Sequence, residues 1–131
     1  MSTYKKTILP EKPLTEVELE MMNIIWRLGK GTVNQILEEL PAERKLAYTS
    51  VSTIVRILEQ KGYLKPIKDG RGHIYQPLVA KEIYEEASIK HLVNHVFDGT
   101  PSSLVKRLIG TKELSEPELR EIKRLLDEKG I

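Results

Sequence analysis

One segment in the middle of the chain constrains the fold most, because an amphipathic helix there is followed directly by a short β-hairpin. Apolar residues at i, i+3, i+4 and i+7 predict a helix over about residues 48–61, with one buried face. Gly62 is a natural end for this helix. Two short strands are then expected at 63–67 and 73–78, around a basic turn at 69–72.

Two shorter helical patterns precede this segment. Thr15 and Glu18 form a capping box at the start of the first helix, and Thr32 can cap the second. Three helices followed by a basic hairpin predict a winged helix-turn-helix domain over residues 14–78. In that architecture the third helix enters the major groove, and the hairpin lies along the DNA backbone or minor groove. Residues 1–13 are expected to form a flexible N-terminal arm.

Beyond residue 80 the pattern is helical throughout. Three short amphipathic helices are expected, at about 80–97, after Pro101 and from Ser115. Because about 50 residues enclose too little interior to bury three apolar stripes, we expect a second copy to cover them. The predicted fold is therefore mainly α with a small β-hairpin wing, and residues 80–131 form a three-helix dimerisation domain. The residues assigned to the dimer interface are Ile89, Leu92, Val93, Val96, Leu104, Val105, Leu108, Leu119, Ile122 and Leu126.

Charge and composition limit the classes of function that the chain can have. The net charge is only +2, but residues 44–76 carry seven basic and two acidic side chains, a distribution that suits a polyanionic partner. The chain has no cysteine, which excludes disulfides, thiol catalysis and thiolate zinc sites. No apolar run is long enough to span a membrane, and no secretory signal is present. We therefore expect a cytoplasmic protein without membrane insertion.

The exposed face of the helix over 48–61 has an unusual composition. A solvated face normally mixes Glu with Lys, whereas this one carries hydroxyl groups, Arg56 and Gln60. Such groups suit phosphates and base edges, with Arg56 as the strongest charged contact; a polar face without a role is the alternative. The residues assigned to the DNA interface are Thr32, Lys45, Tyr48, Thr49, Ser50, Ser52, Thr53, Arg56, Lys68 and Arg71.

Other interpretations have less support in the sequence. The glycines of the hairpin turn lack the spacing of a phosphate-binding loop, and no catalytic constellation is present, so neither an enzyme nor a cofactor is expected. His91 and His95 have the i, i+4 spacing of metal ligands, but no third ligand is apparent, so we expect two surface or interface histidines and no metal site. A winged helix that binds a protein instead of DNA is the alternative function.

Four segments of the chain resemble the penicillinase repressor family. They are LTEVELEMMNIIW at 14–26, TSVSTIVRILEQKGYL at 49–64, GRGHIYQPLV at 70–79 and SLVKRL at 103–108. The family contains winged-helix regulators of β-lactamase and methicillin-resistance operons and their copper-responsive relatives. The resemblance implies a homodimer that binds palindromic double-stranded operator DNA and represses a β-lactamase-type or other stress-response operon, with the C-terminal helices forming the dimer interface.

The sequence departs from the family pattern at three places. The best-known members carry Lys and Arg where Thr49 and Ser52 stand here, so we expect a different operator. In β-lactam-responsive members a membrane sensor-linked protease cuts an Asn-Phe bond, and Arg107 and Leu108 occupy the matching junction, which puts proteolytic release in doubt. Copper-responsive relatives carry a C-terminal cysteine motif, and a chain without cysteine cannot form it.

Overall fold

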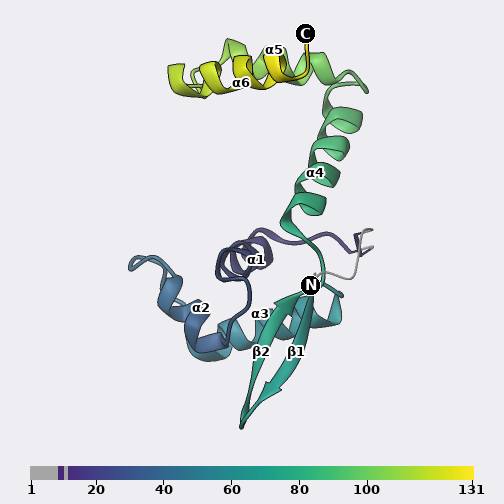
Figure 1. Cartoon of the computed structure of the whole chain (residues 1–131). Helices are drawn as coiled ribbons and strands as arrows, with labels where there is room; N and C mark the ends of the chain where they lie inside the picture. The colour runs from purple at the N-terminus through teal and green to yellow at the C-terminus, as the bar shows by residue number, and fades with distance from the viewer. Residues whose placement is uncertain (1–8, 11) are drawn as a thin grey trace. The chain divides into compact units, whose positions relative to one another are not determined.

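The computed structural model describes residues 9, 10 and 12–131, so most of the expected N-terminal arm lies outside the described residues. The chain divides into two compact units after Ala87. A mostly helical fold with one two-stranded antiparallel hairpin confirms the expected fold class. The elements, labelled in Figure 1, are α1 (Glu16–Leu28), α2 (Val33–Glu39), α3 (Tyr48–Gln60), β1 (Leu64–Asp69), β2 (Gly72–Pro77), α4 (Lys81–Val96), α5 (Pro101–Gly110) and α6 (Glu116–Glu128).

The helices of the first unit begin and end where local signals place them. In the capping box of α1, the Thr15 hydroxyl accepts the Glu18 N–H at 3.2 Å, and the Glu18 carboxylate accepts the Thr15 N–H at 2.9 Å. Thr32 caps α2 in the same way, which confirms both predicted starts. Helix α3 ends at Gln60, and the positive φ of Gly62, 91°, turns the chain towards the hairpin.

Strands β1 and β2 form the wing. Their register runs from Leu64 opposite Pro77 to Asp69 opposite Gly72, so the turn holds only Gly70 and Arg71. Gly70 has φ +60°, which suits the tight two-residue turn. The observed strands therefore reach further towards the tip than the predicted ranges 63–67 and 73–78, because the predicted four-residue turn is two residues too long.

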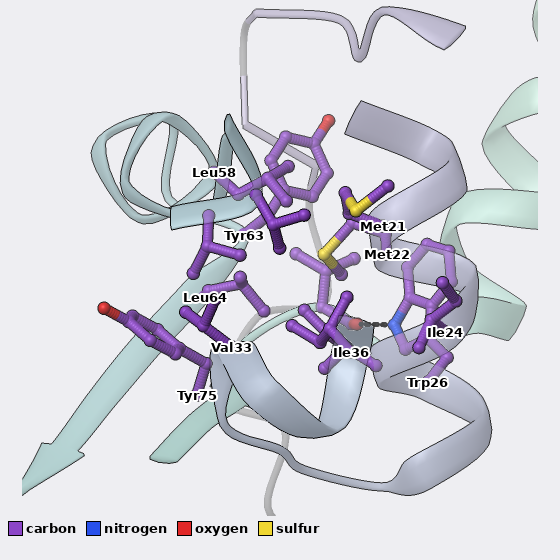
Figure 2. Packing of buried hydrophobic residues seen from close by; sticks show 14 residues of the cluster. Met21, Met22, Ile24, Trp26, Val33, Ile36, Leu58, Tyr63, Leu64 and Tyr75 are labelled. Atoms are coloured by element: carbon purple, nitrogen blue, oxygen red, sulfur yellow. Dashed lines mark hydrogen bonds between the residues drawn. The ribbon is translucent and has the colours of Figure 1, made fainter. Parts of the chain in front are cut away.

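The core of the first unit lies between α1, α2, α3 and the base of the wing (Figure 2). Trp26 is buried there, and its indole Nε1 donates a hydrogen bond of 2.8 Å to the Val79 carbonyl. Ile83 and Tyr84, at the start of α4, pack against the same core. The first turns of α4 therefore belong to the first unit.

The second unit consists of the rest of α4 together with α5 and α6. Gly99, with φ +79°, forms the turn between α4 and α5, and its N–H bonds to the Val93 carbonyl at 2.9 Å. Ser115 and Glu118 form the predicted capping box of α6. Across the described ranges 9–10 and 12–131, no helix is long and apolar enough to cross a membrane.

Candidate nucleic-acid interface

Helix α3 presents two different faces. Val51, Val55 and Leu58 are buried in the core and fix the rotation of the helix about its axis. The same rotation leaves Thr53 and Arg56 exposed on the other side. The polar face expected from the sequence is therefore turned away from the core, where a ligand can reach it.

A groove of about 570 Å³ lies between this face of α3, the start of α2 and the wing. The two β-strands form one wall of this groove. Two backbone hydrogen bonds between Gly31 and Tyr75, of 3.1 and 2.8 Å, hold the α1–α2 loop beside the wing. The groove is lined by Thr32, Val33 and Asn34 from α2 and its cap, by Tyr48, Ser52, Arg56 and Glu59 from α3, and by Pro66, Asp69, Arg71, Gly72, His73 and Tyr75 from the wing.

The groove brings together half of the residues that the sequence assigned to DNA, although they come from three separate elements. The other half lie outside it with exposed side chains. Those in the groove are Thr32, Tyr48, Ser52, Arg56 and Arg71, and those outside it are Lys45, Thr49, Ser50, Thr53 and Lys68.

Four further groove residues with charged, amide or imidazole side chains are absent from the set that the sequence assigned to DNA: Asn34, Glu59, Asp69 and His73. Glu59 stands three positions after Arg56, so helical periodicity could have placed both on one face. Asn34 and His73 carried only a weak signal, namely their closeness in sequence to Thr32 and Arg71. The groove thus contains acceptors and an amide besides the expected cations and hydroxyl groups.

Charges of both signs lie near Tyr75, which lines the groove. Burial raises the pKa of Tyr75, Glu59 raises it further, and Arg56 lowers it. Arg56 makes no ion pair with any residue in the described part of the chain, and its side chain is exposed. Its guanidinium is therefore available to an incoming anion or base edge.

Two cations of the basic segment are already engaged elsewhere. Arg44 donates to both carboxylate oxygens of Glu20 over 3.0–3.1 Å, and this carboxylate raises the pKa of Arg44. Lys61 Nζ donates to the buried Glu18 carboxylate at 2.6 Å and to the Pro13 carbonyl at 3.0 Å. Apart from these two pairs, the excess positive charge lies in the wing, which carries Lys65, Lys68 and Arg71 against Asp69, whereas in α3 Arg56 is matched by Glu59.

The first turn of α3 is also suited to an anion. Its N-cap is Ala47, which has no side-chain group to accept a hydrogen bond, whereas α1, α2 and α6 all have capping boxes. Unsatisfied N–H groups at a helix start favour phosphate oxygens. Among the hydroxyls of α3, that of Thr53 donates to the Thr49 carbonyl at 2.9 Å, so its proton is already used.

The residues assigned to dimerisation are mostly exposed in the single chain. Val93 is buried, Leu104 and Ile122 are half-buried, and the rest lie open on the second unit. The proposed protease junction of Arg107 and Leu108 lies inside α5, with both side chains exposed. The exposed assigned residues are Ile89, Leu92, Val96, Val105, Leu108, Leu119 and Leu126, and Ile109, Leu125 and Ile131 are exposed in addition.

Comparisons with known proteins agree with this architecture. The penicillinase repressor family model matches residues 14–128. The methicillin resistance regulatory protein MecI of Mammaliicoccus sciuri is 29% identical over 116 residues, covering 88% of this chain and 94% of that protein. The penicillinase repressor of Bacillus licheniformis is 28% identical over 115 residues, with 88% and 90% covered.

A solved structure connects the fold to DNA. The solution structure of the Bacillus licheniformis BlaI monomeric form in complex with the blaP half-operator is similar to 59% of this chain and 94% of that chain. Its TM-score is 0.50 and its sequence identity 26%. The family-model match covers most of the chain, and the winged-helix architecture is shared with this DNA-bound structure. The chain therefore belongs to the penicillinase repressor family of transcriptional repressors.

Proposed function

We propose that this protein is a homodimeric repressor that binds palindromic operator DNA in the cytoplasm through α3 and the wing. The observation that carries the proposal is the groove in which Arg56 of α3 and Arg71 of the wing face one ligand-sized space. An exposed recognition helix beside a basic hairpin is the arrangement with which a winged helix contacts duplex DNA.

The side chains divide by the part of the DNA that their chemistry fits. Lys45, Lys68 and Arg71 are exposed cations around the groove and would position the protein on phosphates. Arg56 projects from the middle of α3 and would read a base edge, because an arginine fork matches the two acceptors of guanine. Ser52 and Tyr48, which line the same groove, would complete the contact.

The exposed apolar side chains of the second unit support a homodimer. Soluble monomers rarely leave so many large apolar residues of three neighbouring helices in water. A second copy supplies a matching apolar surface by symmetry, and a two-fold axis would place two α3 helices on two half-sites. The BlaI relative, whose monomeric form was solved on a half-operator, is consistent with one chain on each half-site.

Loss of the dimer is the simplest route to release from DNA. Arg107 and Leu108 stand where β-lactam-responsive members have the Asn-Phe bond that is cut, and a cut at this junction would divide α5 and separate α6 from the rest of the chain. We expect a chain cut at this bond to lose tight operator binding. A cut chain that binds the operator as tightly as the intact one would exclude release from DNA by cleavage at this junction.

The deciding experiment is fluorescence anisotropy with a labelled duplex from upstream of the protein's own gene, against a scrambled duplex, at two salt concentrations. Tight binding to the native duplex that weakens steeply with salt is expected, because each neutralised phosphate releases counterions. Arg44→Ala serves as a control variant that should bind the native duplex as the wild type does, since this arginine is held by Glu20. Absence of binding at low salt would instead favour a protein-binding winged helix.

A further inference from the structure

His73 stands on the side of the wing that faces α3. It lies opposite Lys68 in the register of the two strands, and Tyr75 lies opposite Pro66. Side chains that are directly opposite each other, or two positions apart on one strand, share a face of a hairpin. The rings of His73 and Tyr75 accordingly have their centroids only 6.3 Å apart. Because Pro66, His73 and Tyr75 all line the groove, this face of the wing is the one turned towards α3.

The groove beside this face is the place where a strand of the DNA backbone would lie. A winged helix puts its third helix into the major groove and its hairpin along the backbone or into the minor groove. One sugar–phosphate strand separates a major groove from the minor groove next to it, so this strand has to pass between α3 and the wing. The placement rests on the proposed function. It directs the exposed side chain of His73 at phosphate oxygens.

His73 is also the lining residue whose type changes charge near neutral pH. Imidazoles gain a proton as the pH falls from about 8 to 5. Carboxyl groups titrate below that range, and ammonium, guanidinium and phenol groups titrate above it. The charge of the groove therefore rises by up to one unit when His73 is protonated. The other charged or titratable groups that surround His73 are Lys68, Asp69, Arg71 and Tyr75 of the wing and Tyr48, Arg56 and Glu59 of α3.

We propose that protonated His73 binds a phosphate group of the DNA backbone from the groove side of the wing, so that DNA binding takes up a proton. The imidazolium donates to a phosphate oxygen of the strand that Lys68 and Arg71 attract by their charges. A phosphate beside the ring favours the charged form, and the charged form binds phosphate more tightly, so the two equilibria are linked. Affinity for DNA therefore rises as the pH falls through the range in which the ring gains its proton.

Fluorescence anisotropy of a labelled duplex at about pH 8 and about pH 6, at constant ionic strength, tests the proposal. Phosphate contacts carry no sequence information, so the native and the scrambled duplex both report on it. The wild type should bind about two- to fivefold more tightly at the lower pH, which is the scale of one exposed ion pair. Its affinity should also fall more steeply with salt there, by about one released counterion.

Three variants of the full chain isolate the histidine. His73→Gln should bind at both pH values as the wild type does at the higher one, and His73→Arg, whose charge is permanent, should bind tightly at both. The double variant His91→Gln/His95→Gln is the matched control, because it removes the other two histidines of the chain, which lie on α4 outside the groove. It should keep the full pH dependence. Circular dichroism at both pH values checks the fold of each variant.

The outcomes separate this contact from the proposed function. Loss of the pH dependence in both His73 variants, with retention in the double variant, supports the phosphate contact. A wild type whose binding does not change with pH would overturn it, as would a His73→Gln variant with the pH dependence of the wild type, and both results leave DNA binding through α3 and the wing intact. A wild type that binds neither duplex at the lower pH and low salt would contradict the proposed function, and this contact with it.

Discussion

Both units of the molecule have apolar residues at helical spacing, but they bury them very differently. In the first unit Ile25, Ile36 and Leu58 are fully buried, whereas in the second Ile109 and Leu125 remain 57% and 46% exposed. Helical spacing of apolar residues therefore identifies a face that needs a partner, without saying whether the partner lies in the same chain.

The difference follows from what each unit has available to cover a stripe. The first unit combines three helices with a hairpin, and side chains from all of these elements enclose a core that includes Trp26 and Tyr63. The second unit has two short helices and part of α4, from residue 88 onward, which enclose little more than Val93. Small units rarely supply their own core, so a second copy is the expected completion.

Removal of α5 and α6 tests whether the exposed apolar surface of the second unit holds the dimer together, and it has the largest expected effect on operator affinity. A chain ending after Gly99 keeps the groove but loses most of the exposed apolar surface. We expect a monomer whose operator affinity is lower by about 10²–10⁴-fold, because the second half-site no longer binds as a linked event. Sedimentation velocity and anisotropy measure the two effects, and unchanged Trp26 fluorescence verifies the fold. A tightly binding truncated dimer would place the interface in the first unit.

A pair of leucine truncations compares the two units at the level of one side chain. Leu58→Ala should lower the free energy of unfolding by about 2–5 kcal/mol at every protein concentration, because it leaves a cavity inside one chain. Leu125→Ala should act only where the dimer is populated, so its effect depends on protein concentration. Urea unfolding at two concentrations measures both. A concentration-independent loss in Leu125→Ala would mean that the second unit has a core of its own.

Arg56→Ala tests whether the groove reads bases. We expect it to weaken operator binding by about 1–3 kcal/mol and to reduce the preference over scrambled DNA, as loss of a bidentate base contact does. Arg44→Ala is the matched control, because its guanidinium is occupied by Glu20 and it lies outside the groove. Anisotropy with both duplexes checks the pair. Equal preference in the wild type and Arg56→Ala would remove Arg56 from the base-reading set.

The fold was predictable from the sequence wherever the signal was local. Capping boxes at Thr15 and Ser115 place two helix starts because both partners lie within one turn. The wing was predicted with strands too short at the tip. Asp69 and Gly72 belong to a ladder that continues up to a two-residue turn, and turn-forming residues alone do not reveal how far a ladder extends.

The site was less predictable, because its electrostatics depend on distant partners. Arg44 and Lys61 counted as cations of the basic segment, yet their carboxylates, Glu20 and Glu18, stand 24 and 43 residues away. Nothing in the local sequence pairs them. Residues such as Asn34 likewise enter the groove only because the wing folds back beside α2.

The smallest expected effect concerns the buried Glu18–Lys61 pair of the first unit. Burial raises the pKa of Glu18, but hydrogen bonds from Lys61 and Thr15 and the lysine charge together outweigh it, so the pKa lies below its ordinary value of 4.5. The pair therefore stabilises the fold above the pH at which the unfolded carboxyl titrates, and this stabilisation is lost as the pH falls through the lower folded pKa. Glu18→Gln should cost about 1–2 kcal/mol at neutral pH, because Lys61 keeps the Pro13 carbonyl as an acceptor. Urea unfolding at neutral and acidic pH should show this cost shrinking in acid.

Glu118 provides the matched control, because it occupies the same capping-box position in the second unit. It accepts the Ser115 N–H at 2.8 Å, and this bond and that of the Ser115 hydroxyl lower the pKa of Glu118, but its side chain is exposed and no lysine reaches it within the described residues. Water replaces a lost bond at such a position, so Glu118→Gln should change stability less than Glu18→Gln does. If the two substitutions lower the free energy of unfolding by amounts that depend equally on pH, burial beside Lys61 adds nothing to the capping box of α1. If the loss caused by Glu18→Gln depends more strongly on pH, the two capping boxes contribute differently to stability, because only the first unit has a core in which its box is buried.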